Sequence, residues 1–232
     1  ADYMGQMRTG AASGVATKFL SNPNASVAAI IGTGGQAATQ LEAVAAVRKL
    51  QSARVFSRNP QNRQSFCKNM TARIGIPVTA AESPSEAVRG ADIVCTATTA
   101  SKPVLHAGEV SPGMHINAIG VNHAHKQELD EQAVAAASVI VVDSIEQSRQ
   151  EAGDLVLAFR GDESRWAAVK KLSDIVGGKT QGRTKATEVT LFKSNGIASW
   201  DLAVAVRVYD LARQKGLGRE LPFWTEAIGA AG

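Results

Sequence analysis

Residues 27–40, VAAIIGTGGQAATQ, decide the fold of this 232-residue chain. An apolar run ends at Gly32, and helix-forming residues follow the glycines, so the stretch predicts a strand, a tight turn and a helix. Gly32 permits the sharp turn, and Gly34, which lacks a Cβ, lets a pyrophosphate approach the backbone. The N–H groups of Gly35 and Gln36 at the helix start can then hold phosphate oxygens. The stretch therefore predicts a dinucleotide site.

The rest of the chain must support this interpretation, because a single G-x-G-x-x-A pattern also suits a glycine-rich turn in other α/β proteins. Short apolar runs recur along the chain and alternate with helical stretches. Their residues are continuously apolar, which is typical of strands buried on both faces of a parallel sheet. We therefore predict an α/β fold with a doubly wound, Rossmann-type parallel sheet. The predicted strands span residues 27–31, 53–57, 77–80, 92–97, 115–120, 138–142 and 189–192.

Helices are predicted between these strands. Ser83 can cap one of them, and Glu86 completes its capping box. In the last helix, apolar side chains recur at helical spacing, and core packing is the expected role of this stripe. Gly216 ends that helix. The predicted helices span 8–20, 35–50, a stretch after Pro60, a stretch after Ser83, 146–151 and 197–215, and residues 177–185 are predicted to form a loop.

Composition narrows the classes of function. With 44% hydrophobic and 20% charged residues, the chain suits one large domain, or one domain with part of a second. The net charge is only +4 and the basic residues are scattered, which favours anionic small molecules as ligands over nucleic acid. The sequence shows no apolar run near the roughly 18 residues of a membrane span, no secretory signal and no metal-ligand spacing. Cys67 and Cys95 form no C-x-x-C pair, which favours a reducing, cytoplasmic location.

The end of the second strand indicates which nucleotide binds. An acidic residue there would hold the ribose 2′-OH and favour NAD(H). This chain has Ser57 and Arg58 instead. Ser57 can donate a hydrogen bond, and Arg58 can pair with a 2′-phosphate and stack on adenine. We therefore favour NADP(H) over NAD(H); the alternative is that Arg58 is a solvated loop residue.

Six motifs in this order resemble the ornithine cyclodeaminase/mu-crystallin family over nearly the whole chain. That family has a Rossmann domain and a second domain that binds substrate and forms a homodimer. The resemblance implies that residues 1–22 are a remnant of the second domain, that 23–196 form the NAD(P)-binding domain, and that 197–232 return to the second domain. The motifs are RTGAA (8–12), IGTGGQAATQ (31–40), DIVCTATTASKPVL (92–105), INAIG (116–120), KQELD (126–130) and VTLFKSNG (189–196).

The family's activities give several possible functions. Its members bind NAD(H) or NADP(H), and they cyclise ornithine or lysine with loss of ammonia, reduce ketimines and cyclic imines, or oxidise amino acids. A few serve mainly as binding proteins. We expect a cytoplasmic, homodimeric NAD(P)H-dependent reductase of small α-imino acids, which is an amino-acid dehydrogenase in reverse. The alternatives are a cyclodeaminase with bound NAD and a non-catalytic NADP-binding protein like mu-crystallin.

The resemblance also implies roles for individual residues. Arg8 corresponds to the arginine that grips the substrate carboxylate, a task that suits a bidentate guanidinium; the alternative is a surface arginine at a helix start. Gly35 and Gln36 correspond to pyrophosphate contacts, and Ser57 and Arg58 lie where adenosine is read. The positions that correspond to residues near the ribose and nicotinamide are Thr96, Asn117, Ala118, Ile119, Lys126 and Ser194.

Two departures from the family pattern affect the expected chemistry. Asn122 stands where the cyclodeaminases have a catalytic aspartate, and an amide cannot take a proton as a carboxylate does. We assign Asn122 to the catalytic position as a group that orients a substrate amine or imine, which favours imine reduction over cyclodeamination. His123 and His125 could donate a proton, although such loop histidines are more often solvated. The second departure is the start of the chain, where the family's upstream segment, with a lysine and other substrate contacts, is absent.

Overall fold

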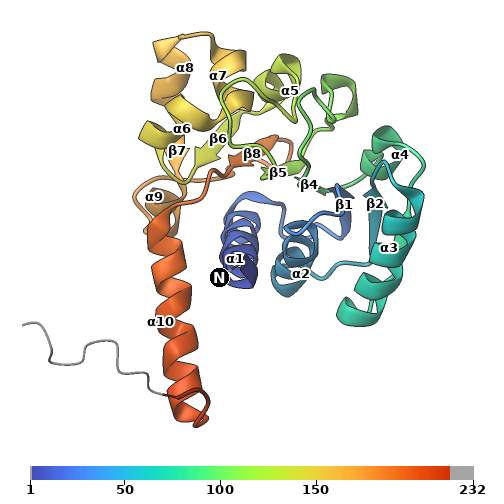
Figure 1. Cartoon of the computed structure of the whole chain (residues 1–232). Helices are drawn as coiled ribbons and strands as arrows, with labels where there is room; N and C mark the ends of the chain where they lie inside the picture. Colours follow the sequence, from blue (N-terminus) through green and yellow to red (C-terminus); the bar gives the residue numbers. More distant parts are fainter. Residues whose placement is uncertain (1, 220–232) are drawn as a thin grey trace, which may run out of the picture.

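The computed structural model describes residues 2–219, and its centre is an eight-stranded parallel sheet (Figure 1). The strand order is β3-β2-β1-β4-β5-β8-β6-β7, and every neighbouring pair is parallel. This confirms the predicted Rossmann-type sheet. The strands are β1 Val27–Ile31, β2 Ser52–Phe56, β3 Val78–Ala80, β4 Ile93–Thr96, β5 His115–Ala118, β6 Val139–Val142, β7 Lys170–Lys171 and β8 Thr190–Lys193.

Helices cover both faces of this sheet (Figure 1). Asn59 and Ser83 cap the starts of α3 and α4 by accepting hydrogen bonds from the N–H groups of Asn62 and Glu86. The helices are α1 Asp2–Leu20, α2 Ala37–Val47, α3 Pro60–Ile74, α4 Pro84–Val88, α5 Glu131–Ala136, α6 Ile145–Glu151, α7 Gly153–Phe159, α8 Glu163–Ala168, α9 Leu172–Val176 and α10 Ala198–Gln214, with a 3₁₀ turn η1 at Ala107–Glu109.

Successive strand residues pack in different hydrophobic clusters, because their side chains point to opposite faces of the sheet. On β1, Ala28 and Ile30 pack with α2 and α3, whereas Ala29 and Ile31 pack with α4, α5 and α7. β1, β4, β5 and β8 are almost wholly buried. Continuous apolar runs in the sequence therefore mark the centre of the sheet, as expected for strands covered on both sides.

The strand order places two features at the carboxyl edge of the sheet. Neighbouring strands β1 and β4 continue in opposite directions, to β2 on one side and to β5 on the other, so a topological switch point lies between them. In addition, β8 lies between β5 and β6, so Lys193 at its end has a strand on either side, in register with Ala118 and Val142.

Helix α1 begins at Asp2 rather than at Arg8, so the predicted start was wrong although the end at Leu20 was right. Its small residues allow close packing on α2. A Cβ at Gly10 would lie 2.5 Å from the Thr39 carbonyl oxygen, and one at Gly14 would lie 3.1 Å from the Ala43 side chain. α1 is thereby held against α2.

Two further expectations need correction. Residues 153–176 carry α7, α8, β7 and α9, none of which was predicted, because these elements are short and their apolar spacing is irregular. The apolar stripe of α10 does not pack in the core: Leu202, Val206 and Tyr209 are 66%, 52% and 59% exposed. The reason is visible in Figure 1, where α10 extends beyond the sheet. The predicted division into residues 1–22, 23–196 and 197–232 stays a prediction, and 220–232 lie outside the described residues.

Within residues 2–219, no helix has the length and apolar character that a membrane crossing requires.

We predict opposite effects for two glycine substitutions on α1. Gly10→Ala should lower the free energy of unfolding by about 1–3 kcal/mol, because the added methyl group meets the Thr39 backbone. Gly5→Ala, whose Cβ would have no atom within 4 Å, should raise it by roughly 0.5–1 kcal/mol, since alanine is the better helix former. Urea unfolding followed by circular dichroism measures both. Equal effects would contradict the α1–α2 packing.

Candidate functional site

The glycine loop opens directly at the switch point. Gly32 follows β1, donates its N–H to the Phe56 carbonyl at 2.8 Å, and has a φ of 108°, which only glycine adopts without strain. A Cβ at Gly32 would also clash with the Ala97 carbonyl after β4. The loops that follow β1 and β4 are therefore in direct contact, as expected for the walls of a ligand crevice in a doubly wound sheet.

The next residues leave room for an anionic group. Gly34 and Gly35 are exposed, and a Cβ at Gly34 would have no atom within 4 Å. Gln36 occupies the cap position of α2, but its side chain makes no capping hydrogen bond and no acidic residue stands in the first turn. These features fit a pyrophosphate at the α2 start.

The predicted adenosine contacts lie after β2. The hydroxyl of Ser57 donates to the Asn59 carbonyl at 3.2 Å, and Arg58 is exposed. Arg63, on α3, is buried: it lies over the Phe56 ring and pairs with Glu82 at 2.7 Å. Arg63 is therefore held by contacts within the protein, at Phe56 and Glu82, whereas the exposed Arg58 side chain can reach a ligand.

The end of β5 is buried and polar on one face. The Asn117 side chain donates to Thr17 Oγ1 at 3.0 Å and lies 3.2 Å from the His115 ring, so any cofactor contact of Asn117 comes from its backbone. Burial lowers the pKa of His115 to about 3, which leaves the ring neutral. Ala118 and Ile119 are also buried, and the Ile119 N–H donates to the Thr96 carbonyl at 2.9 Å.

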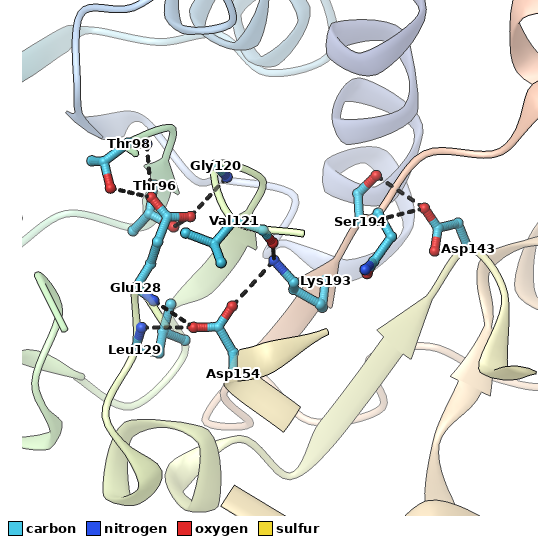
Figure 2. Close-up of polar contacts among 11 residues, drawn as sticks. Thr96, Thr98, Gly120, Val121, Glu128, Leu129, Asp143, Asp154, Lys193 and Ser194 are labelled. Atoms are coloured by element: carbon cyan, nitrogen blue, oxygen red, sulfur yellow. Dashed lines mark hydrogen bonds and ion pairs between the residues drawn. The ribbon is translucent and has the colours of Figure 1, made fainter. Parts of the chain in front are cut away.

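A buried carboxylate joins the loops after β4 and β5 (Figure 2). Glu128 is fully buried. Its Oε1 accepts the N–H and the hydroxyl of Thr98, both at 2.7 Å. Its Oε2 accepts the Thr96 hydroxyl at 2.9 Å and the Gly120 N–H at 2.7 Å. Burial raises the pKa of the Glu128 carboxyl, and the nearby positive charge of Lys193 opposes that rise.

A buried ion pair also contacts the loop after β5 (Figure 2). Lys193 and Asp154 are both buried, and Lys193 Nζ lies 3.1 Å from Asp154 Oδ2. Lys193 also donates to the Val121 carbonyl. The other oxygen of Asp154 accepts the N–H groups of Glu128 and Leu129 at 2.6 and 2.9 Å. The Lys193–Asp154 ion pair and the hydrogen-bonded carboxyl of Glu128 therefore belong to one buried network.

The loop between these anchors presents the predicted catalytic position. Asn122, His123 and His125 are exposed, and the two imidazole rings lie 5.9 Å apart. The Lys126 N–H donates to the His123 carbonyl at 3.0 Å, which closes a turn. Gly153 at the start of α7 lies against this turn, where a Cβ would clash with the carbonyls of Lys126 and His123.

Arg8 lies in a second part of the site, a cavity of about 370 Å³ between α1, α9 and α10. Its Nε pairs with Asp201 at 3.2 Å, and its guanidinium lies against Gly196 in the turn after β8. Two residues before Arg8 on α1, the Gln6 side chain approaches Gly35 of the glycine loop, 3.4 Å from where a Cβ would stand. α1 therefore connects the Arg8 cavity with the predicted pyrophosphate site.

Asp143 shapes the turn that borders this cavity. This carboxylate is buried at the end of β6 (Figure 2). Its Oδ2 accepts the Ser194 hydroxyl at 3.1 Å and the N–H groups of Asn195 and Gly196 at 2.8 and 2.6 Å. The Ser194 hydroxyl is thus already hydrogen-bonded to Asp143, and the same carboxylate holds the backbone that leads to Gly196, against which Arg8 lies.

The sequence predicted site residues in the glycine loop and at the ends of β4 and β5, but it did not predict a role for the buried charged residues near them. Asp143 follows β6 and Lys193 ends β8, and a charged residue at the carboxyl end of a parallel strand is the signal that could have found both. Glu128 lies in the loop after β5 and has no such signal. Asp154 carried no such signal, because α7 was not predicted. Within residues 2–219, no group of three or more His, Cys, Asp or Glu side chains is arranged to hold a metal ion.

The ornithine cyclodeaminase/mu-crystallin family matches residues 1–216. A Δ1-pyrroline-2-carboxylate reductase of Bacillus cereus is 37% identical over 222 residues, which are 95% of this chain and 68% of that protein. The structure of the Thermococcus litoralis Δ1-pyrroline-2-carboxylate reductase in complex with NADH and L-proline has a TM-score of 0.91 and 39% identity, over 94% of this chain and 68% of that one. An archaeal alanine dehydrogenase dimer with bound NAD has a TM-score of 0.88 and 35% identity, over 96% and 68%.

We predict that substitutions at two loop glycines affect dinucleotide affinity and folding stability differently. Gly34→Ala should leave the free energy of unfolding within about 0.5 kcal/mol of the original, because its methyl group meets no protein atom. It should weaken NADH and NADPH binding by about tenfold or more, because the methyl group occupies the path of the pyrophosphate. Gly32→Ala should lower both stability and affinity. Calorimetric titration and thermal unfolding measure these effects, and unchanged affinity in Gly34→Ala would rule out the assigned phosphate position.

Proposed function

The chain belongs to the ornithine cyclodeaminase/mu-crystallin family, and we propose that it is an NAD(P)H-dependent reductase of small α-imino acids, which acts in reverse as an amino-acid dehydrogenase. The observation that carries this proposal is the position of Arg8. It faces a cavity, and its helix also touches the glycine loop. A guanidinium there can hold a carboxylate beside a cofactor in the crevice. The Bacillus cereus and Thermococcus litoralis relatives are named as reductases of a cyclic imino acid, which supports the reaction class.

The side chains present fit this reaction in distinct ways. When bound, a reduced nicotinamide supplies the hydride that the C=N carbon receives. Arg8 exchanges its contact with Asp201 for the substrate carboxylate, with which it can make two parallel hydrogen bonds. Asn122 orients the nitrogen through its amide and does not transfer the proton. Water at this exposed loop, or one of its two histidines, supplies the proton to the nitrogen.

NADP(H) is the cofactor we favour. No carboxylate stands at the end of β2, and the Ser57 and exposed Arg58 side chains that follow it can contact a ribose 2′-phosphate. The two solved relatives described above hold NADH or NAD. The preference for the 2′-phosphate therefore depends on this chain's own residues at that position.

We further propose that residues 1–22 and 197–232 belong to a substrate and dimerisation unit, with 23–196 as the nucleotide unit, and that the protein is a cytoplasmic homodimer. The exposed apolar side chains of α10 support this division, because large apolar surfaces on a helix are usually covered by a partner. The archaeal alanine dehydrogenase relative is itself described as a dimer.

Reduction of Δ1-pyrroline-2-carboxylate tests the proposed activity. The protein as encoded by its gene should consume NADPH or NADH with this substrate, followed by absorbance at 340 nm. Arg8→Ala should raise the KM for the imino acid about 10- to 100-fold, since a charge-assisted contact of about 1.5–3 kcal/mol is lost. Asp201→Asn is the matched control: it releases Arg8 without removing it, so the KM should stay the same or fall.

Two alternative functions give different results in the same assay. Release of ammonia from ornithine without net formation of NADH would identify a cyclodeaminase. Absence of turnover across a broad panel of imino acids, with tight dinucleotide binding, would identify a binding protein.

Cofactor preference forms a separate prediction. Arg58→Ala should reduce the ratio of NADPH to NADH affinity by about 10- to 100-fold, because the 2′-phosphate loses a charge-assisted contact. Lys68→Ala removes the same charge from an exposed position on α3 and should leave the ratio unchanged. Titration of each variant with both dinucleotides measures the ratio. If the double variant Ser57→Asp, Arg58→Ala keeps the ratio of NADPH to NADH affinity of the unaltered protein, the residues at the end of β2 do not select the nucleotide.

A further inference from the structure

The loop at residues 120–128 is anchored at both ends and exposed in its middle. At its start, Gly120 donates to Glu128 and the Val121 carbonyl accepts from Lys193. At its end, the Glu128 N–H donates to Asp154 at 2.6 Å. Between these anchors, Asn122 is exposed. The buried network therefore fixes the loop on which the candidate catalytic position stands.

Glu128 sets the distance between this loop and the one after β4. Its carboxylate accepts four hydrogen bonds: one from Thr96 at the end of β4, two from Thr98 in the loop that follows, and one from Gly120. The loops also touch directly, since a Cβ at Gly120 would clash with the Thr98 backbone. Thr98 itself follows Ala97, whose carbonyl lies against Gly32 of the glycine loop. One carboxylate thus connects three segments that border the crevice.

General stability does not account for this arrangement. Buried charges are costly to desolvate, and well-packed apolar side chains of similar volume often stabilise a fold as well or better. The interiors of the neighbouring strands carry uncharged side chains: Ile93, Val94 and Ile116 are apolar, and Asn117 on β5 is a neutral amide. The charges of Glu128, Asp154 and Lys193 gather only at the carboxyl edge, where the crevice opens.

We propose that Glu128 is a positioning residue, which holds the loops after β4 and β5 at the separation that the nicotinamide half of the dinucleotide and the substrate C=N group require. This inference rests on the proposed function. Lys193 and Asp154 support it by fixing the loop backbone on either side of Asn122. Glu128 touches no reacting atom; it acts through Thr98, Gly120 and the loop that carries Asn122.

Glu128→Gln tests the proposal with little change in volume. Each carboxylate oxygen accepts one backbone N–H, from Thr98 or Gly120. A glutamine places an NH₂ group opposite one of them, and that N–H loses its acceptor. The matched control is Glu131→Gln, which removes the same charge from a half-exposed residue that pairs with Arg160.

The first readout is binding, which does not depend on turnover. NADPH and 2′-phospho-ADP-ribose, which lacks the nicotinamide, are titrated by calorimetry. In Glu128→Gln, NADPH affinity should fall about tenfold, as for one buried donor left without a partner, while the affinity for 2′-phospho-ADP-ribose stays within about threefold. Glu131→Gln should change neither. Equal losses for both ligands, or no loss for either, would overturn the proposal.

The second readout is the deuterium isotope effect on kcat with C4-deuterated NADPH, measured well below the unfolding temperature of each variant. Misplaced loops should lower kcat about tenfold and raise the isotope effect, because hydride transfer limits the rate. A merely structural role would lower the active fraction and leave the isotope effect unchanged, and that outcome also overturns the proposal.

If Glu128→Gln does not fold, Thr98→Ala, which removes one of the four hydrogen bonds, should show the same pattern more weakly. Absence of imine reduction in the unaltered protein counts against the proposed function, whereas normal behaviour of Glu128→Gln in an active protein counts against this inference alone.

Discussion

The buried contact between Lys193 and Asp154 is the interaction on which the carboxyl edge of the sheet depends. Because β8 enters the sheet between β5 and β6, it carries an ammonium group into a position packed on all sides. An isolated charge there would be strongly destabilising, and the carboxylate from α7, 3.1 Å away, makes it tolerable. The same carboxylate binds the backbone at Glu128 and Leu129. One ion pair therefore connects the end of β8, the start of α7 and the backbone of the loop after β5.

Polar groups are distributed unevenly within this fold. The cores on both faces of the sheet consist mainly of aliphatic side chains. Uncharged polar side chains are buried at both ends of the central strands, as at His115 and Thr96, whereas the buried charged residues Asp143, Glu128 and Lys193 lie at the carboxyl edge. Asp143 satisfies three donors of the turn before α10, and Glu128 satisfies four donors of two loops. Such satisfied networks specify one backbone conformation more strictly than apolar contacts do. The fold thus combines apolar cores with hydrogen-bonded loops at the carboxyl edge of the sheet, and the predicted ligand contacts lie in these loops or next to them.

The sequence allowed the sheet and the glycine loop to be predicted because local patterns determine them. Continuous apolar runs marked the central strands, and Gly32 marked the turn. The position of β8 inside the sheet is a long-range property that no local pattern expresses, so the partners of Lys193 could not be foreseen. The exposure of Leu202 on α10 was missed for a related reason, since helical periodicity reports an apolar face and not what covers it. Asn122 was identified only through the family resemblance, and its role stays a prediction.

The close packing of α1 on α2 has a thermodynamic consequence. At Gly10 and Gly14 the two helices touch with almost no intervening side chain, so they are expected to move as one body. The α2 start is the predicted phosphate site, and α1 carries Arg8, which faces the cavity. A dinucleotide that immobilises α2 also immobilises the carboxylate anchor, and the second ligand then has less conformational entropy to lose. By linkage, substrate must strengthen dinucleotide binding by the same factor, so the two ligands would bind with reciprocal positive cooperativity.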